Sequence, residues 1–184
     1  MRFSDYLKKV LTLYADADVA PELQPSATLA EITALEQDFG FPLPEELKQA
    51  WLAANGGGYY KALFARPGYL TGYDFLSLSD CMDERMSMKN RAVQYLDYQQ
   101  EEARDARISP NWYEPGWLPF ASFGGGTLLL ILDMSPRAQG KAGQIICFTH
   151  DPDCMEYVAA SFNDLLVASL KMFEEEADEL IYED

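Results

Sequence analysis

Three consecutive glycines stand directly before an unbroken apolar run in the segment FASFGGGTLLLILD, residues 120–133. A phosphate-binding loop needs the pattern G-x-x-x-x-G-K-[ST], in which the lysine reaches the phosphates, but Thr127 and leucines follow Gly126 here. A dinucleotide-binding loop places its glycines at a strand-to-helix turn, whereas these glycines lead into a strand. The segment therefore predicts a turn or bulge between two adjacent antiparallel strands, and no bound nucleotide cofactor.

The only histidine, His150, lies between Cys147 and Cys154 in the segment CFTHDPDC. A structural zinc site would need four ligands, and this spacing matches none of the familiar zinc motifs. Cys147 belongs to an apolar segment, where a buried and inert thiol is usual. We therefore predict no metal, no cofactor and no catalytic residue, with His150 held by its own DPD turn, and we expect a protein that is not an enzyme.

Net charge narrows the classes of partner. The 184 residues include 14 basic and 30 acidic side chains, which gives a net charge of −16. Nucleic-acid binding needs basic side chains that neutralise phosphates, so direct DNA or RNA binding is not expected. An anionic membrane surface is disfavoured for the same reason, whereas the charge could steer the chain towards a basic partner protein.

Cysteine usage and hydropathy predict a cytoplasmic protein. Three cysteines form an odd set without a C-x-x-C pair, so a disulfide framework is not expected. The first residues lack the apolar core of a secretion signal, and the sequence contains no uncharged apolar stretch of eighteen residues.

Helix start and stop signals divide the first part of the chain into three helices. Apolar residues at spacings of three and four predict an amphipathic helix over residues 2–15. Thr28 and Glu31 form a capping-box pattern that begins a second helix, and Gly40 is suited to end it. Residues 44–56 give a third helix, opened by a proline and closed by Asn-Gly.

The rest of the chain alternates strands with two longer helices. Residues 79–107 contain neither glycine nor proline and predict one long, partly solvated helix, followed by an irregular loop anchored by aromatic side chains at 108–117. The run TLLLIL lacks polar alternation and should be a central strand covered on both faces. A second capping pattern begins the last helix at Ser161. Six segments read as strands: 59–64, 73–78, 118–123, 127–133, 143–149 and 156–161.

Two separated blocks of the sequence resemble the SUKH superfamily, which includes a fungal cell-wall regulator and many bacterial toxin-immunity proteins. The first block, TLAEITALEQDFGFPLPEELKQAWLAANGG, is similar to the family's two helices joined by a G-x-x-L-P-x-x-[LY]-K turn. The second, from WLPF at residue 117 to SFNDLL at residue 166, is similar to its strands, glycine turn and final helix entry. The stretch from DERMSMKN to YEPGW gives no residue-by-residue match. A structural role suffices for each residue that carries the resemblance: Trp117, Pro119, Phe120, Gly124, Gly126 and Asp133.

The residues and the resemblance lead to the same fold class. We predict a single α+β domain over residues 1–184, with a mixed or mostly antiparallel sheet of about five or six strands and helices packed mainly on one side. The SUKH-like core is expected over about residues 28–173. The N-terminal helix 2–15 and an acidic C-terminal tail, 174–184, flank this core. The acidic tail is expected to be a solvated helix end or frayed tail, or an electrostatic docking strip for a basic partner.

The resemblance implies a protein-binding module without catalytic machinery, often one that neutralises a cognate toxin such as a nuclease by direct contact. The acidic composition agrees, because nuclease clefts are basic and an acidic surface can occupy them. The partner expected is therefore a basic toxin domain, and no oligomeric state is predicted. Two alternatives are a regulatory scaffold in cell-wall or stress signalling and a small-molecule binding module with a cleft near Trp117 and Asp133. The candidate partner-binding residues are acids and aromatics expected to be exposed on loops and the tail: Trp112, Tyr113, Glu114, Asp151, Asp153, Glu174, Glu175 and Glu176.

Overall fold

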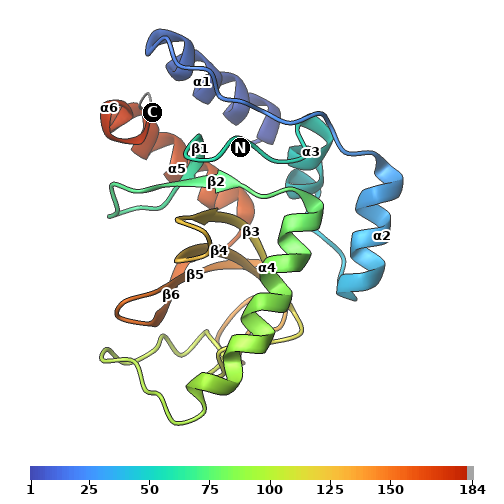
Figure 1. Ribbon diagram of the computed structural model, residues 1–184, viewed down its shortest axis with the longest axis vertical. Coiled ribbons are helices and arrows are strands. Elements are labelled where there is room, and N and C mark those ends of the chain that lie inside the picture. The colour runs from blue at the N-terminus through green and yellow to red at the C-terminus, as the bar shows by residue number, and fades with distance from the viewer. Residues whose placement is uncertain (182–184) are drawn as a thin grey trace.

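A computed structural model of the chain describes residues 1–181 and shows an α+β domain built on one six-stranded antiparallel sheet (Figure 1). The strands lie side by side in chain order, so each strand pairs with the one that precedes it in the sequence. The elements are α1 (Phe3–Asp16), α2 (Leu29–Phe39), α3 (Glu45–Ala53), β1 (Ala62–Ala65), β2 (Gly72–Phe75), α4 (Leu78–Arg91), the 3₁₀ helix η1 (Ala92–Tyr95), β3 (Trp117–Phe123), β4 (Leu128–Asp133), β5 (Gln144–Thr149), β6 (Cys154–Ala159), α5 (Phe162–Glu175) and α6 (Ala177–Leu180).

Local capping groups fix where the helices begin, as the sequence predicted. The Thr28 hydroxyl accepts a hydrogen bond from the Glu31 N–H, at 3.2 Å, and the Glu31 carboxylate accepts one from the Thr28 N–H, at 2.7 Å. Gly40 ends α2 in the left-handed region, with φ of 84°. The Ser161 hydroxyl caps α5 in the same way through the Asp164 N–H. None of the helices within residues 1–181 is long and apolar enough to cross a bilayer.

The three glycines form the turn between β3 and β4, so the expected antiparallel turn is confirmed. Gly124, Gly125 and Gly126 all have positive φ, between 62° and 86°. A residue with a side chain adopts such a conformation only with strain, which explains a run of three glycines at this point.

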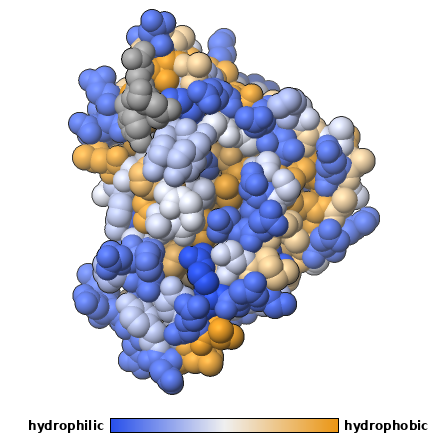
Figure 2. Space-filling view, in the orientation of Figure 1, coloured by the Kyte–Doolittle hydropathy of each residue, from blue (hydrophilic) through white to orange (hydrophobic). Residues whose placement is uncertain are grey.

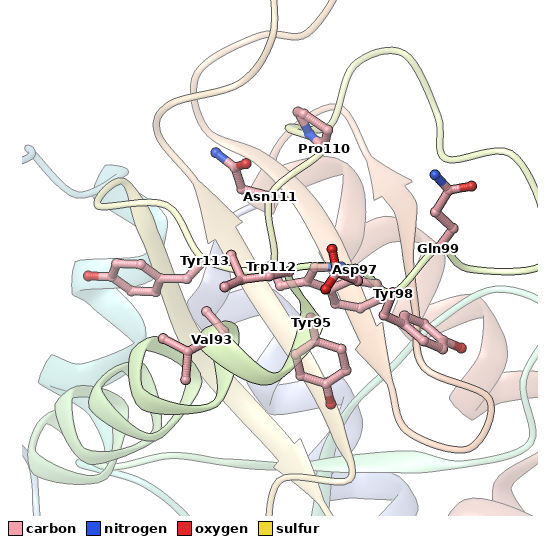
Figure 3. Close-up of a pocket in the computed structure, with 11 residues that line it drawn as sticks. Val93, Tyr95, Asp97, Tyr98, Gln99, Pro110, Asn111, Trp112 and Tyr113 are labelled. Carbon is pink, nitrogen blue, oxygen red and sulfur yellow. The ribbon is translucent and has the colours of Figure 1, made fainter.

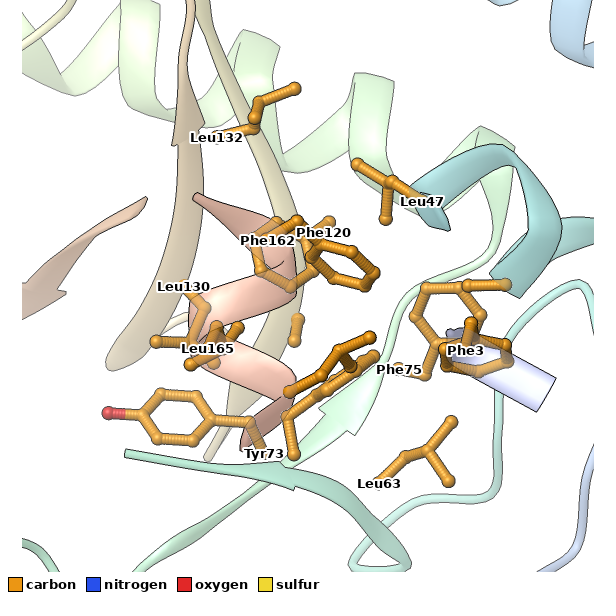
Figure 4. Close-up of a cluster of buried hydrophobic side chains, with 14 of the residues drawn as sticks. Phe3, Leu47, Leu63, Tyr73, Phe75, Phe120, Leu130, Leu132, Phe162 and Leu165 are labelled. Carbon is orange, nitrogen blue, oxygen red and sulfur yellow. The ribbon is translucent and has the colours of Figure 1, made fainter. Parts of the chain in front are cut away.

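Strand β4 lies in the interior of the sheet and is covered on both faces, as its unbroken apolar run predicted. Leu130 and Leu132 belong to the larger cluster of buried side chains, and Leu129 and Ile131 belong to a smaller cluster on the opposite face. Figure 4 shows part of the larger cluster, where side chains of the sheet meet those of α1, α3 and α5. The larger cluster includes side chains of α1, α2, α3 and α5, whereas only the end of α4 and the loop that follows it cover the smaller cluster. The helices therefore lie mainly on one side of the sheet.

The buried hydrophobic core extends beyond residues 28–173, the range predicted for the SUKH-like core. Phe3 and Tyr6 of α1 are buried in the larger cluster, and so are Leu180 and Ile181 near the end of the described chain. Within residues 174–181, α5 continues to Glu175 and α6 packs Leu180 against the body, while the acidic side chains Glu174, Glu175, Asp178 and Glu179 stay exposed. Tyr182, Glu183 and Asp184 of the expected tail lie outside the described residues.

The long helix expected over residues 79–107 is shorter than predicted. Helix α4 ends at Arg91, η1 continues to Tyr95, and an irregular loop follows to β3. Helix propensity alone does not sustain a helix in a protein, because most helical stability comes from packing an apolar face. Val93 and Leu96 find no such packing, since 66% and 82% of their surfaces are exposed.

Candidate protein-binding site

A groove of about 600 Å³ lies where α4 ends, between η1 and the loop 96–116. Aromatic side chains form its floor (Figure 3). The rings of Tyr95 and Trp112 are stacked with their centroids 4.6 Å apart, and Tyr98 meets Trp112 edge-on at 5.5 Å. Aromatic groups from the 3₁₀ helix and from two parts of the loop therefore meet at one place on the surface.

Contacts beneath the groove hold the loop in place. The Arg104 guanidinium lies 4.3 Å from the Trp112 ring and donates hydrogen bonds to the carbonyl oxygens of Ser109, at 2.9 Å, and Asn111, at 2.6 Å. Burial lowers the pKa of Arg104 to about 10, so the group is still a cation at neutral pH. On its other side Trp112 packs edge-on against Phe148 of β5. The floor of the groove is thus anchored to the sheet before any partner arrives.

Apolar side chains project around the groove into solvent. Leu96 and Val93 line it and are largely exposed, and Met86, 51% exposed, lies further along α4. Figure 2 shows an apolar patch at this end of the molecule, at the lower end of α4, with hydrophilic side chains beside it. A contiguous apolar patch of this kind, rimmed by polar residues, is typical of an interaction surface.

Acidic residues lie beside the apolar patch. Asp97 lines the groove, and Asp153 lies next to it because the Tyr98 hydroxyl donates to the Asp153 carbonyl oxygen at 3.3 Å. Asp151 is exposed on the same β5–β6 turn. The helical side of the patch is less acidic, because α4 carries Lys89 and Arg91 in its last turn.

The expected site residues divide into two groups at opposite ends of the molecule. Glu174 and Glu175 are exposed near the end of α5, where they pair with Lys9, at 3.8 Å, and Lys171, at 3.6 Å, and the partly buried Glu176 follows. The other five lie around the groove or on the neighbouring β5–β6 turn: Trp112, Tyr113, Glu114, Asp151 and Asp153.

Two of these five are less available to a partner than expected, because one is buried and the other is already hydrogen-bonded within the loop. Trp112 is only 8% exposed, since it anchors the loop to the smaller cluster, so the expectation of an exposed tryptophan is wrong. Glu114 accepts hydrogen bonds from the Ser109 hydroxyl and, at 2.8 Å, from the Asn111 side chain. That carboxylate therefore stabilises the loop. Tyr113 is half-buried and lines the groove.

Four further residues line the groove and were not predicted as site residues: Val93, Tyr95, Leu96 and Tyr98. These residues were expected to lie in the partly solvated long helix. Their spacing gives no signal that could have separated them, because Tyr95 and Tyr98 are three residues apart, as on one face of a helix.

The cysteine and histidine residues form no metal site in the structure. His150 Nδ1 lies 2.6 Å from Asp153 Oδ1, which confirms that its own turn holds it. Cys147 is buried, and the three thiols are free. Within residues 1–181, no group of three or more histidine, cysteine or acidic side chains is placed to hold a metal ion.

The cleft expected beside Trp117 and Asp133 is filled. Both residues are fully buried, and Asp133 accepts hydrogen bonds from Gln144 Nε2 and from the Ser135 N–H, both at 2.9 Å. Burial raises the pKa of the Asp133 carboxyl, although these hydrogen bonds oppose the shift. A small molecule therefore has no open space at this position.

Comparison with known proteins gives one family and one curated relative. The model of the SMI1 / KNR4 family (SUKH-1) matches residues 26–168. The chain is also 27% identical over 155 residues to the "Cell wall biosynthesis/cell cycle regulator smi1" of Schizosaccharomyces pombe. That alignment covers 76% of this chain and 29% of the relative, so the chain spans less than a third of the relative's length.

Proposed function

This chain belongs to the SMI1 / KNR4 family (SUKH-1), and on that premise we propose that it is a non-enzymatic protein-binding module that neutralises a basic toxin domain by direct contact. The groove at the end of α4 and its acidic border would form the contact surface. We further propose that the protein acts in the cytoplasm, where a toxin produced in or entering the same cell would meet it.

One observation carries this proposal: an anchored aromatic groove opens beside acidic side chains, in a chain with net charge −16. Tryptophan and tyrosine are enriched among the residues that dominate binding energy, and such residues are surrounded by groups that exclude water. Here Tyr95 and Tyr98, held against the buried ring of Trp112, supply aromatic surface, and Leu96 supplies exposed apolar surface beside them.

Charge adds selectivity for a basic partner. A nuclease binds phosphates with a positively charged cleft, and an acidic protein surface presents the same sign of charge as the substrate. Long-range attraction would speed association with such a cleft, while the apolar patch would slow dissociation. The two features together fit direct inhibition by occupation of the cleft.

Affinity capture tests the proposal. The tagged chain is used to recover proteins from its source cells at low and at physiological salt, and a recovered basic domain is assayed for toxicity and nuclease activity with and without the chain. We expect one basic domain to be retained at physiological salt and its activity to be lost on binding. Recovery of no toxic or nucleolytic protein would contradict the proposal.

A matched pair of variants tests the groove itself. Leu96→Asp places a charge in the apolar patch and should weaken binding of the recovered domain by about tenfold or more. Leu29→Asp makes the same change at another exposed leucine, 66% exposed at the start of α2, and should leave binding unchanged. Equal effects of the two variants would exclude the groove as the contact surface.

The relative from Schizosaccharomyces pombe favours a second candidate, a regulatory scaffold in cell-wall or stress signalling. In that case the same capture experiment would recover signalling proteins of the host, and the chain would protect no cell from a toxin.

A further inference from the structure

The free edge of β6 is closed by side chains and not by a further strand. Strand β6 pairs with β5 on one side and is the last strand in the sheet. On its open side the Gln100 side chain accepts a hydrogen bond from the Met155 N–H, at 3.1 Å, and donates one to the Met155 carbonyl oxygen, at 3.4 Å. The amide of Gln100 thus occupies the positions that the backbone of a neighbouring strand would take.

The next outward-facing residue of this edge is Tyr157. Met155 and Tyr157 pair in regular register with Phe148 and Ile146, and a bulge follows at Val158. Because backbone groups of alternate residues point to the same side of a regular strand, the N–H and C=O of Tyr157, just before the bulge, face outward as those of Met155 do. Within residues 1–181 no side chain or loop is hydrogen-bonded to these two groups. An edge with unpaired backbone groups is a template for another strand.

The opposite edge of the sheet is closed more completely. The buried hydroxyls of Tyr6 and Tyr14 donate to the carbonyl oxygens of Leu63, at 2.6 Å, and Ala62, at 2.8 Å. The buried Ser169 hydroxyl accepts from the Ala65 N–H on the same strand, at 2.8 Å. Helices α1 and α5 supply these groups, so β1 offers no comparable template.

An acid-lined hollow of about 240 Å³ lies beside the β6 edge and includes Gln100 in its wall. Its other lining residues are Tyr69, Glu101, Glu102, Thr149, Pro152, Asp153, Cys154 and Glu156. The buried Arg66 pairs with Glu156, at 3.0 Å, and His150 contacts Asp153, at 2.6 Å, so Glu101 and Glu102 are the carboxylates that most clearly give the hollow its negative charge. No lysine, arginine or histidine lines it.

We propose that the β6 edge binds an extended segment of a basic partner protein as an added antiparallel or parallel strand. The backbone of this segment would pair with Tyr157 and, after displacing the Gln100 amide, with Met155, while a lysine or arginine side chain enters the acid-lined hollow. This inference rests on the proposed function and specifies how the partner is held. A second copy of the chain is the weaker occupant, since two chains of charge −16 repel each other.

Two variants change the edge in opposite directions. Gln100→Ala removes the side chain that competes for Met155 and should tighten binding of an added strand between about two- and tenfold. Tyr157→Pro removes the outward-facing N–H of Tyr157. That N–H is not hydrogen-bonded to β5, so the sheet keeps its own hydrogen bonds, and binding of an added strand should weaken by about tenfold. Tyr157→Val removes the same ring but keeps the N–H, and should bind like the unchanged chain.

The probe is a fluorescent decapeptide in which lysine and valine alternate, titrated into the full chain at physiological salt. Its control is the same peptide with N-methyl groups on alternate backbone nitrogens, which keeps the charge and blocks strand pairing. Hydrogen exchange of the Tyr157 amide, measured with and without peptide, reports pairing directly. We expect slower exchange with the unmodified peptide only.

The outcomes separate this inference from the proposed function. Equal binding of the methylated and unmodified peptides, or a Tyr157 amide that exchanges at the same rate with and without peptide, would overturn strand addition. If the recovered basic domain then binds Tyr157→Pro normally but fails to bind Leu96→Asp, the proposed function stands and only the strand inference fails. Dimerisation through β6 in place of peptide binding, measured by sedimentation, would also overturn it.

Discussion

Asp133 and Gln144 form a buried polar pair where β4 and β5 meet the loop 96–116. Gln144 Nε2 donates to Asp133 Oδ2, at 2.9 Å, and also to the Arg107 carbonyl oxygen in the loop, at 3.1 Å. The second Asp133 oxygen accepts from the Ser135 N–H. These contacts connect the sheet to the loop that carries the groove, so they support the site from below without touching a partner.

Replacing Asp133 by alanine should lower the free energy of unfolding by about 1–3 kcal/mol, because buried donors on Gln144 and Ser135 lose their acceptor. The loss should depend on pH. Burial raises the pKa of Asp133 in the folded state, so the folded chain holds its proton more tightly than the unfolded chain. The carboxyl group therefore contributes most in acid and less as the pH rises through the folded pKa.

Urea unfolding between about pH 4 and 7 measures this effect. The stability difference between the unchanged chain and Asp133→Ala should shrink as the pH rises. Asp133→Asn keeps one acceptor oxygen and cannot titrate. The stability difference between the unchanged chain and Asp133→Asn should therefore also shrink as the pH rises, but it should be smaller than that of Asp133→Ala at every pH. A difference that grows with pH would mean that the ionised carboxylate is the stabilising form.

At the scale of secondary structure, the start of α2 rests on a capping box that involves only two side chains. Thr28→Ala should lower the free energy of unfolding by about 1 kcal/mol, since the Glu31 N–H loses its acceptor and the Glu31 carboxylate loses the hydrogen bond from the Thr28 hydroxyl, at 2.8 Å. Thr33→Ala removes a threonine hydroxyl that bonds the Leu29 carbonyl oxygen in the same helix, at 2.8 Å. We expect the second change to cost less, measured by thermal and urea unfolding. Equal losses would mean that the cap contributes nothing specific.

The elements that the sequence predicted well are those fixed by local chemistry. Thr28 with Glu31, Gly40 and the three glycines after Phe123 each act within a few residues, and the structure confirms every one of them. The end of α4 was predicted wrongly because it depends on distant contacts. Nothing in residues 79–107 shows that apolar positions beyond Arg91 find no core, or that Arg104 instead anchors a loop.

The same reasoning explains why the site was predicted only in part. Tyr113 and the acids of the β5–β6 turn were predicted as candidates because aromatic and acidic loop residues are common at interfaces. The stacking of Tyr95 on Trp112 joins residues that are far from helical spacing, and it exists only after the loop folds back on the sheet. Sequence periodicity carries no information about such a contact.

At the scale of the whole molecule, the segments outside the family match are part of the same core. The Tyr6 hydroxyl of α1 lies 2.7 Å from the Ser169 hydroxyl of α5, and both lie outside residues 26–168. The two segments pack side by side over β1, at the end of the molecule away from the groove (Figure 1). The family core therefore carries the groove, while the flanking helices close the β1 edge.

The charge of the whole chain should appear in the kinetics of partner binding. Charges separated by more than about 8–10 Å are screened at physiological salt, whereas buried apolar contacts are not. Raising the salt from about 10 mM to about 150 mM should therefore slow association with the basic partner by about tenfold and change the dissociation rate little.

Leu96→Asp should act on the dissociation step. It should speed dissociation, because it disrupts apolar contact in the groove. Surface plasmon resonance over a salt series, with Leu29→Asp as the control, separates the two rates. An association rate that does not change with salt would show that the net charge of −16 does not guide the partner to this surface.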